Sequence, residues 1–421
     1  MSTIAVGHSV PRVEGVGKVT GQVKFPADYY VPGMLYGKTL RSAIPSGYVK
    51  NIDISKAEAL PGVWKVVTAK DVLGHNGHGV LFPRTPILVS SRIRSVNDAI
   101  ALVVAESETV AEEALGLIQV EYEELPGVFD PREAMKDSAP KVWEEGNILY
   151  HLPIRKGNVD HGFAEADVIV ENSYSTQMVD HAFLQPEAAF CTLDERGNLV
   201  VRVATQYVQW DRVEIARALG LNLNQVRVVC TAIGGAFGAR EDMTIQIHCA
   251  LLTWLTKRPV KMVYDRRESF HAHSKRHPMY MEYKTGAKKN GRLTAVEATI
   301  IGDSGAYASW SPNVLRKAAI HATGPYEVPH VKIDAFAVYT NNPFTGAMRG
   351  FGAAQPPVAH EAQMDLLAEK LNLHPFTIRW RNLFQVGSIT ATGQVLGSSV
   401  GLKECLVAAA GAYGWKAREL L

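Results

Sequence analysis

The residues best suited to chemistry lie in a glycine-rich turn, IGGAFGARED, at residues 233–242. This turn follows an apolar, strand-like run, VRVVC, and precedes an apolar helical run, MTIQIHCALLTWL. Glycine permits positive φ angles and a close approach of the backbone to a ligand, and free N–H groups at a helix start attract anions. Its glycines match neither a phosphate-binding loop nor a dinucleotide fingerprint. The pattern predicts either an anion site or a purely structural turn.

A second glycine turn, TGAMRGFGAAQ at residues 345–355, lies between a strand-like run, IDAFAVY, and a helical run. Each turn carries a phenylalanine, Phe237 in the first and Phe351 in the second. Two such turns before two different helices suit a buried site lined by backbone donors and aromatic rings. The alternative for Phe351 is an apolar anchor for the helix that follows it.

Gln206, in ATQYVQWDR, stands at the end of one predicted strand and just before a predicted helix. A glutamine amide there can donate a hydrogen bond to an oxo ligand or accept one from a substrate. It can equally be a loop amide whose hydrogen bonds are satisfied by the backbone.

Histidines and cysteines give little support for a metal site made of side chains. His271, His273 and His277 lie close together, but no Asp, Glu or Cys at the usual spacing completes a tetrahedral set. The four cysteines are scattered and form no C-x-x-C pair, so neither a zinc knuckle nor an iron–sulfur cluster is expected in this chain. We expect His181 to be structural or to lie near a cofactor.

Composition indicates a globular protein. The 421 residues are 47% hydrophobic and 20% charged, with a net charge of +2, which gives no reason to expect a nucleic-acid partner. The N-terminus lacks an apolar core of signal-peptide length, and no apolar run reaches about 18 residues. With few, scattered cysteines, the expectation is a cytoplasmic protein without a membrane span.

The first part of the chain reads as a mixed unit. GKVTGQVKF and GMLYGKTLRS predict strands bounded by glycine and proline, and the apolar run at residues 99–105 predicts a buried strand. ESETVAEEALGLI predicts a helix beginning near Ser107, and IQVEYEEL predicts a half-buried strand. Strand, helix and strand in this order predict a compact α/β domain over residues 1–130.

The polar, turn-rich residues 131–146 are interpreted as a linker. A second unit, residues 147–421, consists of strand-like runs separated by turns. Its helices are predicted at DRVEIARALG, after Glu241, and at about residues 358–371.

The motifs IGGAFGARE, TQYVQ, RRESF with KRHP, GDSGAY, AMRGFG and IRWRNL occur in the order seen in the xanthine dehydrogenase and aldehyde oxidase family. Each motif alone is weak, but the ordered set covers nearly the whole chain, which resembles a molybdopterin-binding member of this family. The resemblance implies an α+β fold. An α/β hammerhead domain, residues 1–130, is followed by the N-terminal half of a molybdenum-cofactor-binding domain, residues 147–421.

The resemblance also implies which residues bind the cofactor. Gln206 matches the glutamine that hydrogen-bonds an oxo ligand of molybdenum. Phe237 and Gly238 match the pair beside the metal whose backbone N–H groups face the cofactor, and Gly235 lies in the same turn. Arg349 matches the arginine whose backbone lies along the cofactor. No protein side chain is expected to ligate the metal.

Two further residues match substrate contacts in this family. Glu241 matches a position that contacts purines in some members, and Phe351 matches an aromatic ring that packs on the substrate. Gln185 is a departure, because many members have glutamate at that place in an H-x-x-x-E-P motif.

The activity implied is the hydroxylation of an aromatic N-heterocycle with water as the oxygen source, with nicotinate to 6-hydroxynicotinate as the expected reaction. The implied cofactor is molybdopterin cytosine dinucleotide with molybdenum, which carries a sulfido or selenido ligand. Electrons are expected to leave through 2Fe–2S clusters to FAD in partner subunits. The alternatives are a hydroxylase of another N-heterocycle, a purine or an aldehyde.

The sequence ends at GWKARELL without a GVGE-like segment, which in this family supplies a general-base glutamate. A base is needed to deprotonate the attacking oxygen. We therefore expect a second molybdopterin subunit to bring the C-terminal half, alongside an FAD subunit and an iron–sulfur subunit. The remaining alternative is a non-catalytic scaffold or cofactor-insertion protein.

Overall fold

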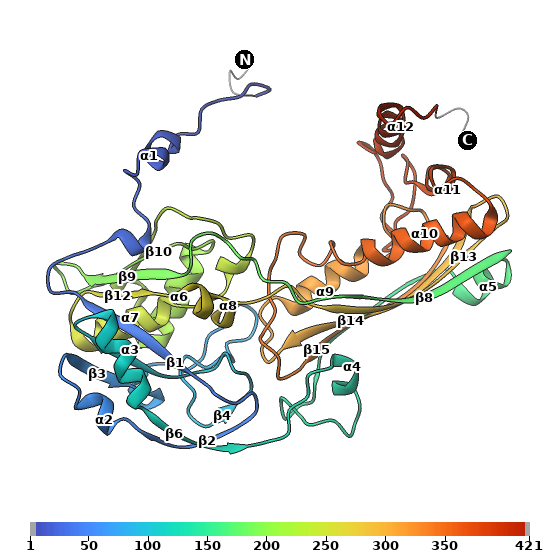
Figure 1. Ribbon diagram of the computed structural model, residues 1–421. Coiled ribbons are helices and arrows are strands. Elements are labelled where there is room, and N and C mark those ends of the chain that lie inside the picture. The colour runs from blue at the N-terminus through green and yellow to red at the C-terminus, as the bar shows by residue number, and fades with distance from the viewer. Residues whose placement is uncertain (1–5, 417–421) are drawn as a thin grey trace. The chain divides into compact units, whose positions relative to one another are not determined.

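The computed structural model describes residues 6–416, which form two compact units built from interleaved stretches of chain (Figure 1). Unit 1 contains Met1–Gly79, Pro83–Leu125 and Ala182–His273, and unit 2 contains Val80–Phe82, Pro126–His181 and Ser274–Leu421. Among residues 6–416, no helix is long and apolar enough to cross a membrane. The linker predicted at residues 131–146, between the two domains predicted from the sequence, remains a proposal.

A seven-stranded mixed sheet dominates unit 1, in the order β11-β10-β9-β12-β1-β5-β3. Its strands are β1 (Leu35–Arg41), β3 (Val63–Val67), β5 (Ala99–Ala105), β9 (Ala188–Leu193), β10 (Leu199–Val203), β11 (Val226–Cys230) and β12 (Val260–Val263). Strand β1 pairs in parallel with β12 on one side and antiparallel with β5 on the other. The sheet therefore joins early and late parts of the chain.

A smaller antiparallel sheet in unit 1 has the order β4-β2-β6, with β4 at Arg92–Ile93, β2 at Gly47–Asp53 and β6 at Gln119–Glu124. Helix α3 (Glu108–Leu117) begins as predicted, because Ser107 accepts a hydrogen bond of 3.2 Å from the Val110 N–H. Every residue of β5 is buried, as its apolar run predicts.

The remaining helices of unit 1 are α1 (Gly15–Val19), α2 (Ser55–Glu58), α6 (Val208–Leu219), α7 (Gln246–Thr256) and α8 (Arg266–Ala272). Helices α6 and α7 share one hydrophobic core with strands β9–β12 and so cover one face of the large sheet. The strand predicted for GKVTGQVKF is wrong. Its first residues belong to α1, whose bonds are local, and no neighbouring strand pairs with this segment among the described residues.

Unit 2 is built on a five-stranded sheet in the order β7-β15-β14-β13-β8. Its strands are β7 (Ile148–Lys156), β8 (Val168–Thr176), β13 (Met279–Ala287), β14 (Leu293–Gly305) and β15 (His330–Tyr339). Helix α9 (Ser311–Ile320) connects the parallel strands β14 and β15, and it lies with α10 (Pro357–Leu371) on one face of the sheet (Figure 1). The other α-helices of unit 2 are α4 (Pro131–Ala134), α5 (Val159–Ala164), α11 (Pro375–Asn382) and α12 (Leu402–Ala412).

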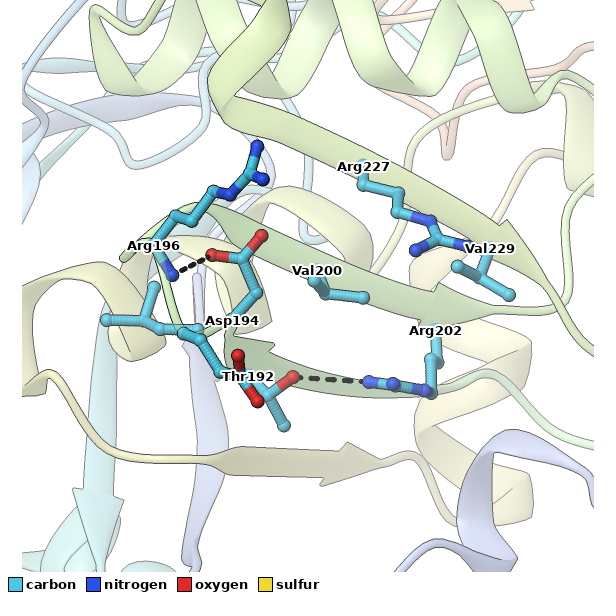
Figure 2. Close-up of a pocket in the computed structure, with 9 residues that line it drawn as sticks. Thr192, Asp194, Arg196, Val200, Arg202, Arg227 and Val229 are labelled. Carbon is cyan, nitrogen blue, oxygen red and sulfur yellow. Dashed lines mark hydrogen bonds between the residues drawn. The ribbon is translucent and has the colours of Figure 1, made fainter.

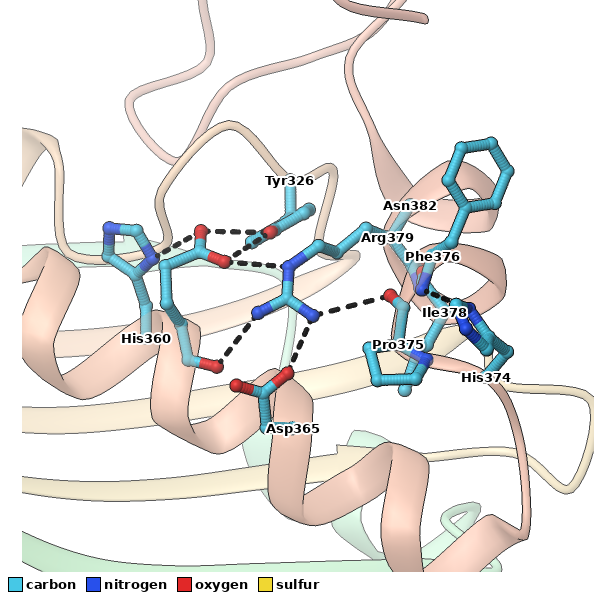
Figure 3. Close-up of polar contacts among 10 residues, drawn as sticks. Tyr326, His360, Asp365, His374, Pro375, Phe376, Ile378, Arg379 and Asn382 are labelled. Carbon is cyan, nitrogen blue, oxygen red and sulfur yellow. Dashed lines mark hydrogen bonds and ion pairs between the residues drawn. The ribbon is translucent and has the colours of Figure 1, made fainter. Parts of the chain in front are cut away.

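A carboxylate-centred network joins α10 to α11 (Figure 3). Glu361 accepts hydrogen bonds from the Tyr326 hydroxyl at 2.8 Å and from Arg379 Nε at 2.8 Å. Arg379 also donates to Asp365 at 2.7 Å. Burial favours the protonated carboxyl, but hydrogen bonds from His360, Tyr326 and Arg379 outweigh it and lower the pKa of Glu361 to about 2.

This network predicts a pH-dependent contribution to stability. Because the folded-state pKa is below the ordinary value of 4.5, the stabilisation is complete above that value and is lost as pH falls towards 2. Glu361→Gln should lower the free energy of unfolding at pH 7 by about 1–3 kcal/mol and flatten the loss of stability at acid pH.

Thermal unfolding between pH 7 and pH 2 measures both effects. Glu369→Gln is the matched control, since Glu369 lies exposed on the same helix and has no side-chain hydrogen bond among the described residues. Equal melting temperatures for the two variants across this pH range would show that the network does not stabilise unit 2.

Candidate active site

The first candidate site forms at the carboxyl ends of β10 and β11. These strands are parallel neighbours, so the turns that follow them meet at one edge of the sheet. The Gly238 N–H donates to Gln206 Oε1 at 3.1 Å, and Gln206 Nε2 donates to Glu241 Oε1 at 3.2 Å. The structure thus brings together Gln206, Gly238 and Glu241, whose roles towards a cofactor or substrate remain predictions.

The backbone of the glycine turn is held in an unusual conformation. Phe237 has φ 53° between Gly235 at φ 109° and Gly238 at φ 113°, and its side chain is 48% exposed. A Cβ at Gly235 would lie 2.7 Å from the Phe183 Cβ, so only glycine fits. Positive φ at a large, exposed aromatic residue is a costly arrangement that is concentrated at functional sites.

Three consecutive N–H groups in this turn, those of Gly235, Ala236 and Phe237, donate to no acceptor within residues 6–416. All three residues are at least partly exposed. A run of free backbone donors around left-handed residues forms a concave site for anions and oxo groups. The turn therefore fits a ligand that carries oxygen acceptors.

Arg240 holds this turn and was missed by the sequence interpretation. It is 4% exposed, and its guanidinium donates to the Gly235 carbonyl at 2.8 Å and to the Gln185 carbonyl at 2.6 Å. The same group lies 4.4 Å from the centre of the Phe183 ring, and the Arg240 carbonyl accepts the Gln206 N–H at 3.0 Å. Arg240 is thus a positioning residue for both turns. An arginine inside a glycine-rich motif was the only available signal.

Gln185, which departs from the family motif, forms two hydrogen bonds with Gly234 at the start of the glycine turn. Its Oε1 accepts the Gly234 N–H at 2.6 Å, and its own N–H donates to the Gly234 carbonyl at 3.2 Å. A Cβ at Gly234 would lie 2.5 Å from the Gln185 Cβ. The Gln185 Nε2 is buried and has no hydrogen-bond partner among the described residues, so one amide donor stays available beside the turn.

Glu241 lies in a setting that favours its protonated form. Burial, followed by the neighbouring Asp242 carboxylate, raises its pKa against the hydrogen bonds from Tyr207 and Gln206. A carboxyl of raised pKa exchanges protons closer to neutral pH than an exposed glutamate does.

The second glycine turn belongs to unit 2. Phe351 has φ 47° between Gly350 at φ 99° and Gly352 at φ 95°. The exposed Arg349 contributes its carbonyl, which accepts a hydrogen bond of 2.8 Å from Arg276 Nη2. These residues belong to unit 2, whereas the Gln206 cluster belongs to unit 1.

Phe351 makes apolar contacts within unit 2. Its partly buried ring packs edge-on against Trp310 at 5.9 Å between centroids. A Cβ at Gly352 would lie 2.0 Å from the Val314 carbonyl oxygen of α9, which explains the glycine after Phe351. These contacts are consistent with the anchor alternative, and substrate packing by Phe351 stays a prediction.

Two of the histidines singled out in the sequence form hydrogen bonds within unit 2. His181 Nε2 lies 2.8 Å from the Ala347 carbonyl oxygen, and His277 Nε2 lies 2.8 Å from the Ser311 hydroxyl. Burial, followed by the Arg276 charge, lowers the pKa of His277 to about 3. Within residues 6–416, no group of three or more His, Cys, Asp or Glu side chains is arranged to hold a metal ion.

Comparison with protein families matches two stretches of the chain. Residues 142–383 match the molybdopterin cofactor-binding domain. Residues 20–126 match the a/b hammerhead domain of aldehyde oxidase and xanthine dehydrogenase. Together the matches account for most of both compact units.

Comparison with individual proteins gives the same result as comparison with the families. The nicotinate dehydrogenase large molybdopterin subunit of Eubacterium barkeri is 45% identical, covering 95% of this chain and 94% of the relative. A probable xanthine dehydrogenase subunit from Bacillus subtilis is 40% identical, covering 88% of this chain but 50% of the relative. Aldehyde oxidoreductase from Desulfovibrio gigas superimposes with a TM-score of 0.92 at 31% identity, covering 96% of this chain and 46% of that one. The chain thus spans nearly all of the first relative and about half of the other two.

The contacts of Arg240 lead to a prediction for stability and local order. Arg240→Met keeps an apolar stem against Phe183 but leaves the Gly235 and Gln185 carbonyls without their donor. We therefore expect the free energy of unfolding to fall by about 1–3 kcal/mol. Amide hydrogen exchange in residues 233–242 should become faster, while exchange in β5 should be unchanged. Arg240→Lys should restore part of the protection. Unchanged exchange in Arg240→Met would contradict the role assigned to this side chain.

Proposed function

Because this chain belongs to the xanthine dehydrogenase and aldehyde oxidase family, we propose that its glycine turns hold the molybdenum cofactor of a hydroxylase. The observation that carries this proposal is the row of free N–H groups at residues 235–237 beside the Gln206 amide. The cofactor supplies the redox chemistry when it is bound. The protein supplies donors, orientation and a defined electrostatic environment.

The hydrogen-bond pattern suggests how each residue acts. Gln206 Nε2 uses one hydrogen towards Glu241 and keeps a second for an oxo ligand. The Gly238 N–H is already donated to Gln206 Oε1, so Gly238 orients that amide. The N–H groups of Gly235 and Phe237 are the donors that we assign to the cofactor. Arg349 is assigned to it through its backbone.

Two residues are assigned to the substrate. The raised pKa of Glu241 makes its carboxyl a candidate donor or acceptor for a ring nitrogen or oxygen. Phe351 is assigned as the aromatic surface on which a planar substrate packs. Its strained backbone between two glycines holds the ring in a fixed direction.

Nicotinate is the proposed substrate, and 6-hydroxynicotinate the product. The support is the likeness to a subunit named for nicotinate dehydrogenase, which extends over nearly the full length of both chains. A purine is the second candidate, because another relative is named for a probable xanthine dehydrogenase. An aldehyde or another N-heterocycle would give the same cofactor chemistry.

The proposed assembly is a complex of several subunits. The cofactor is proposed to be the cytosine dinucleotide form, with a sulfido or selenido ligand. A second molybdopterin subunit is proposed to bring the general base, and separate subunits to carry FAD and 2Fe–2S clusters. The names of the relatives as subunits support this. The complex is proposed to be cytoplasmic.

Purification of the complex from its native host, with molybdenum analysis and assays on nicotinate and xanthine, tests the proposal. We expect molybdenum in the complex and oxidation of nicotinate in preference to xanthine. A complex that holds no molybdenum and oxidises neither compound would favour the scaffold or cofactor-insertion alternative.

Gln206→Ala tests the oxo-ligand contact. Removing one preorganised donor typically lowers turnover by about 10²–10³-fold, whereas the free N–H groups of the turn should keep molybdenum bound. Turnover per molybdenum is the quantity to measure, with Gln209→Ala as the control, since Gln209 is exposed on α6 and makes no side-chain hydrogen bond in the described residues. Equal turnover for both variants would remove Gln206 from the site.

Phe351→Leu separates substrate packing from anchoring. The change preserves apolar character and similar size, so stability should fall only modestly. Loss of the aromatic face should raise KM for a heteroaromatic substrate, and kcat should fall if ring orientation is lost as well. A large drop in melting temperature with unchanged kinetics would identify Phe351 as an anchor for α9 and α10.

A further inference from the structure

The outer face of the large sheet in unit 1 carries a hollow of about 540 Å³ at strands β9, β10 and β11 (Figure 2). It is lined by Thr192, Leu193, Asp194, Glu195, Arg196, Val200, Arg202, Arg227 and Val229. Helices α6 and α7 cover the opposite face of these strands. The hollow therefore lies on the face of these strands that α6 and α7 leave uncovered.

Strand alternation places the charges. In β10, Val201 points into the core beneath α6 and α7, so Val200 and Arg202 point outwards. Val200 pairs with Arg227 of β11, and Arg202 pairs with Val229. Two guanidiniums and two valines therefore alternate across the floor of the hollow, and Arg196 lies at its rim.

The arginines have no carboxylate partner in the described residues. Arg202 donates to the Thr192 hydroxyl at 3.2 Å. The side chains of Arg196 and Arg227 make no hydrogen bond or ion pair within residues 6–416, and both are exposed. The Arg202 guanidinium also lies 5.6 Å from the centre of the Tyr29 ring and 5.9 Å from that of Phe190. Of the three arginines, Arg196 and Arg227 are therefore the ones whose guanidiniums keep all their donors unused within the described residues.

The acidic residues of the hollow do not neutralise it. Asp194 accepts the N–H groups of Asn198 at 2.8 Å and Arg196 at 2.9 Å, and the Asn198 bonds are the main cause of its lowered pKa. The Arg196 charge also lowers this pKa, so Asp194 offsets part of the positive charge, and the lining still holds three arginines against two acidic residues. Within the described part of the chain, Glu195 forms no ion pair with any of the three arginines.

Within residues 6–416, Tyr29 covers the part of this sheet face that neighbours the hollow. Tyr29 stacks on Phe190 of β9 at 5.6 Å between centroids, and Lys261 of β12 donates to the Tyr29 carbonyl at 3.3 Å. This cover ends beside Arg202, whose guanidinium lies 5.6 Å from the Tyr29 ring. Beyond it, β10 and the edge strand β11 are open to an additional chain.

We propose that this cationic hollow is a docking surface for a partner subunit, which inserts a segment rich in Asp or Glu between Arg202 and Arg227. The proposal rests on the proposed function, in which the chain works as one subunit of a complex. Arginine pairs match carboxylates in geometry and charge, and interface cores favour arginine over lysine. Among the described residues that line the hollow, none begins a helix of the kind that binds free phosphate.

The hollow also lies on the strands that lead into the candidate site. Strand β10 ends three residues before Gln206, and β11 ends five residues before Gly235. A partner bound here contacts the outer surface of the elements that position the glycine turn. Docking and the geometry of the site are thereby connected through two short strands.

Charge reversal in the purified complex tests the docking surface. Arg196→Glu with Arg227→Glu should weaken retention of one subunit about tenfold or more and reduce the salt dependence of its dissociation. The control reverses the same number of charges with Lys56→Glu and Arg267→Glu, two exposed residues outside the hollow. Equal retention in both double variants overturns the proposal.

A second variant identifies the contact chemically. Arg227→Lys keeps the charge and supplies an amine, which carbodiimide joins to a carboxylate in direct contact. We expect a zero-length cross-link from residue 227 to an Asp or Glu of another subunit in the assembled complex. A cross-link to a second copy of this chain, or no cross-link at all, contradicts the proposal.

Inorganic phosphate serves as the competing probe. A rise in melting temperature with phosphate that disappears in the Arg196→Glu, Arg227→Glu variant would assign the hollow to small anions and overturn docking. The molybdenum content of the unaltered complex is measured separately. Unchanged docking of the double variant in a complex that contains molybdenum would contradict the docking proposal alone. A complex that docks normally but contains no molybdenum would contradict the proposed function alone.

Discussion

The Arg240 guanidinium controls the geometry on which the candidate site depends. It is buried without a carboxylate ion pair in the described residues, and its N–H groups donate to the carbonyl oxygens of Gly235 and Gln185. Burial lowers the pKa of Arg240, while the Glu187 charge acts in the opposite direction. Arg240 satisfies these carbonyl groups, while the N–H groups of residues 235–237 have no acceptor in the described residues and can serve a ligand.

Much of the architecture could be predicted because its signals are local. The apolar run at residues 99–105 is the buried strand β5, and the serine cap at residue 107 begins α3. The helix predicted at about residues 358–371 spans Pro357–Leu371. The helix expected after Glu241 begins later, at Gln246, because the Gln246 side chain accepts the N–H groups of Thr244 and Ile245 and holds them outside the helix.

The non-local features could not be read from the residues. Nothing in GMLYGKTLRS indicates that β1 pairs with β12, more than 200 positions later. The family resemblance placed Gln206, Gly238 and Glu241 at one site, yet it did not show that the Gly238 N–H is used by the glutamine amide. Arg240 escaped notice because its role depends on carbonyl groups 5 and 55 residues away along the chain. Such contacts are fixed by tertiary packing, which periodicity does not encode.

The pairing of β1 with β12 also has a consequence for biosynthesis. A ribosome releases Leu35–Arg41 long before Val260–Val263, so β1 must wait with one edge unpaired while the intervening chain emerges. Contacts of such sequence separation slow folding and prolong the exposure of apolar strands to aggregation. Heterologous production should therefore be sensitive to translation speed and chaperone supply, and the segment before residue 126 should be a poor candidate for expression as an independent fragment.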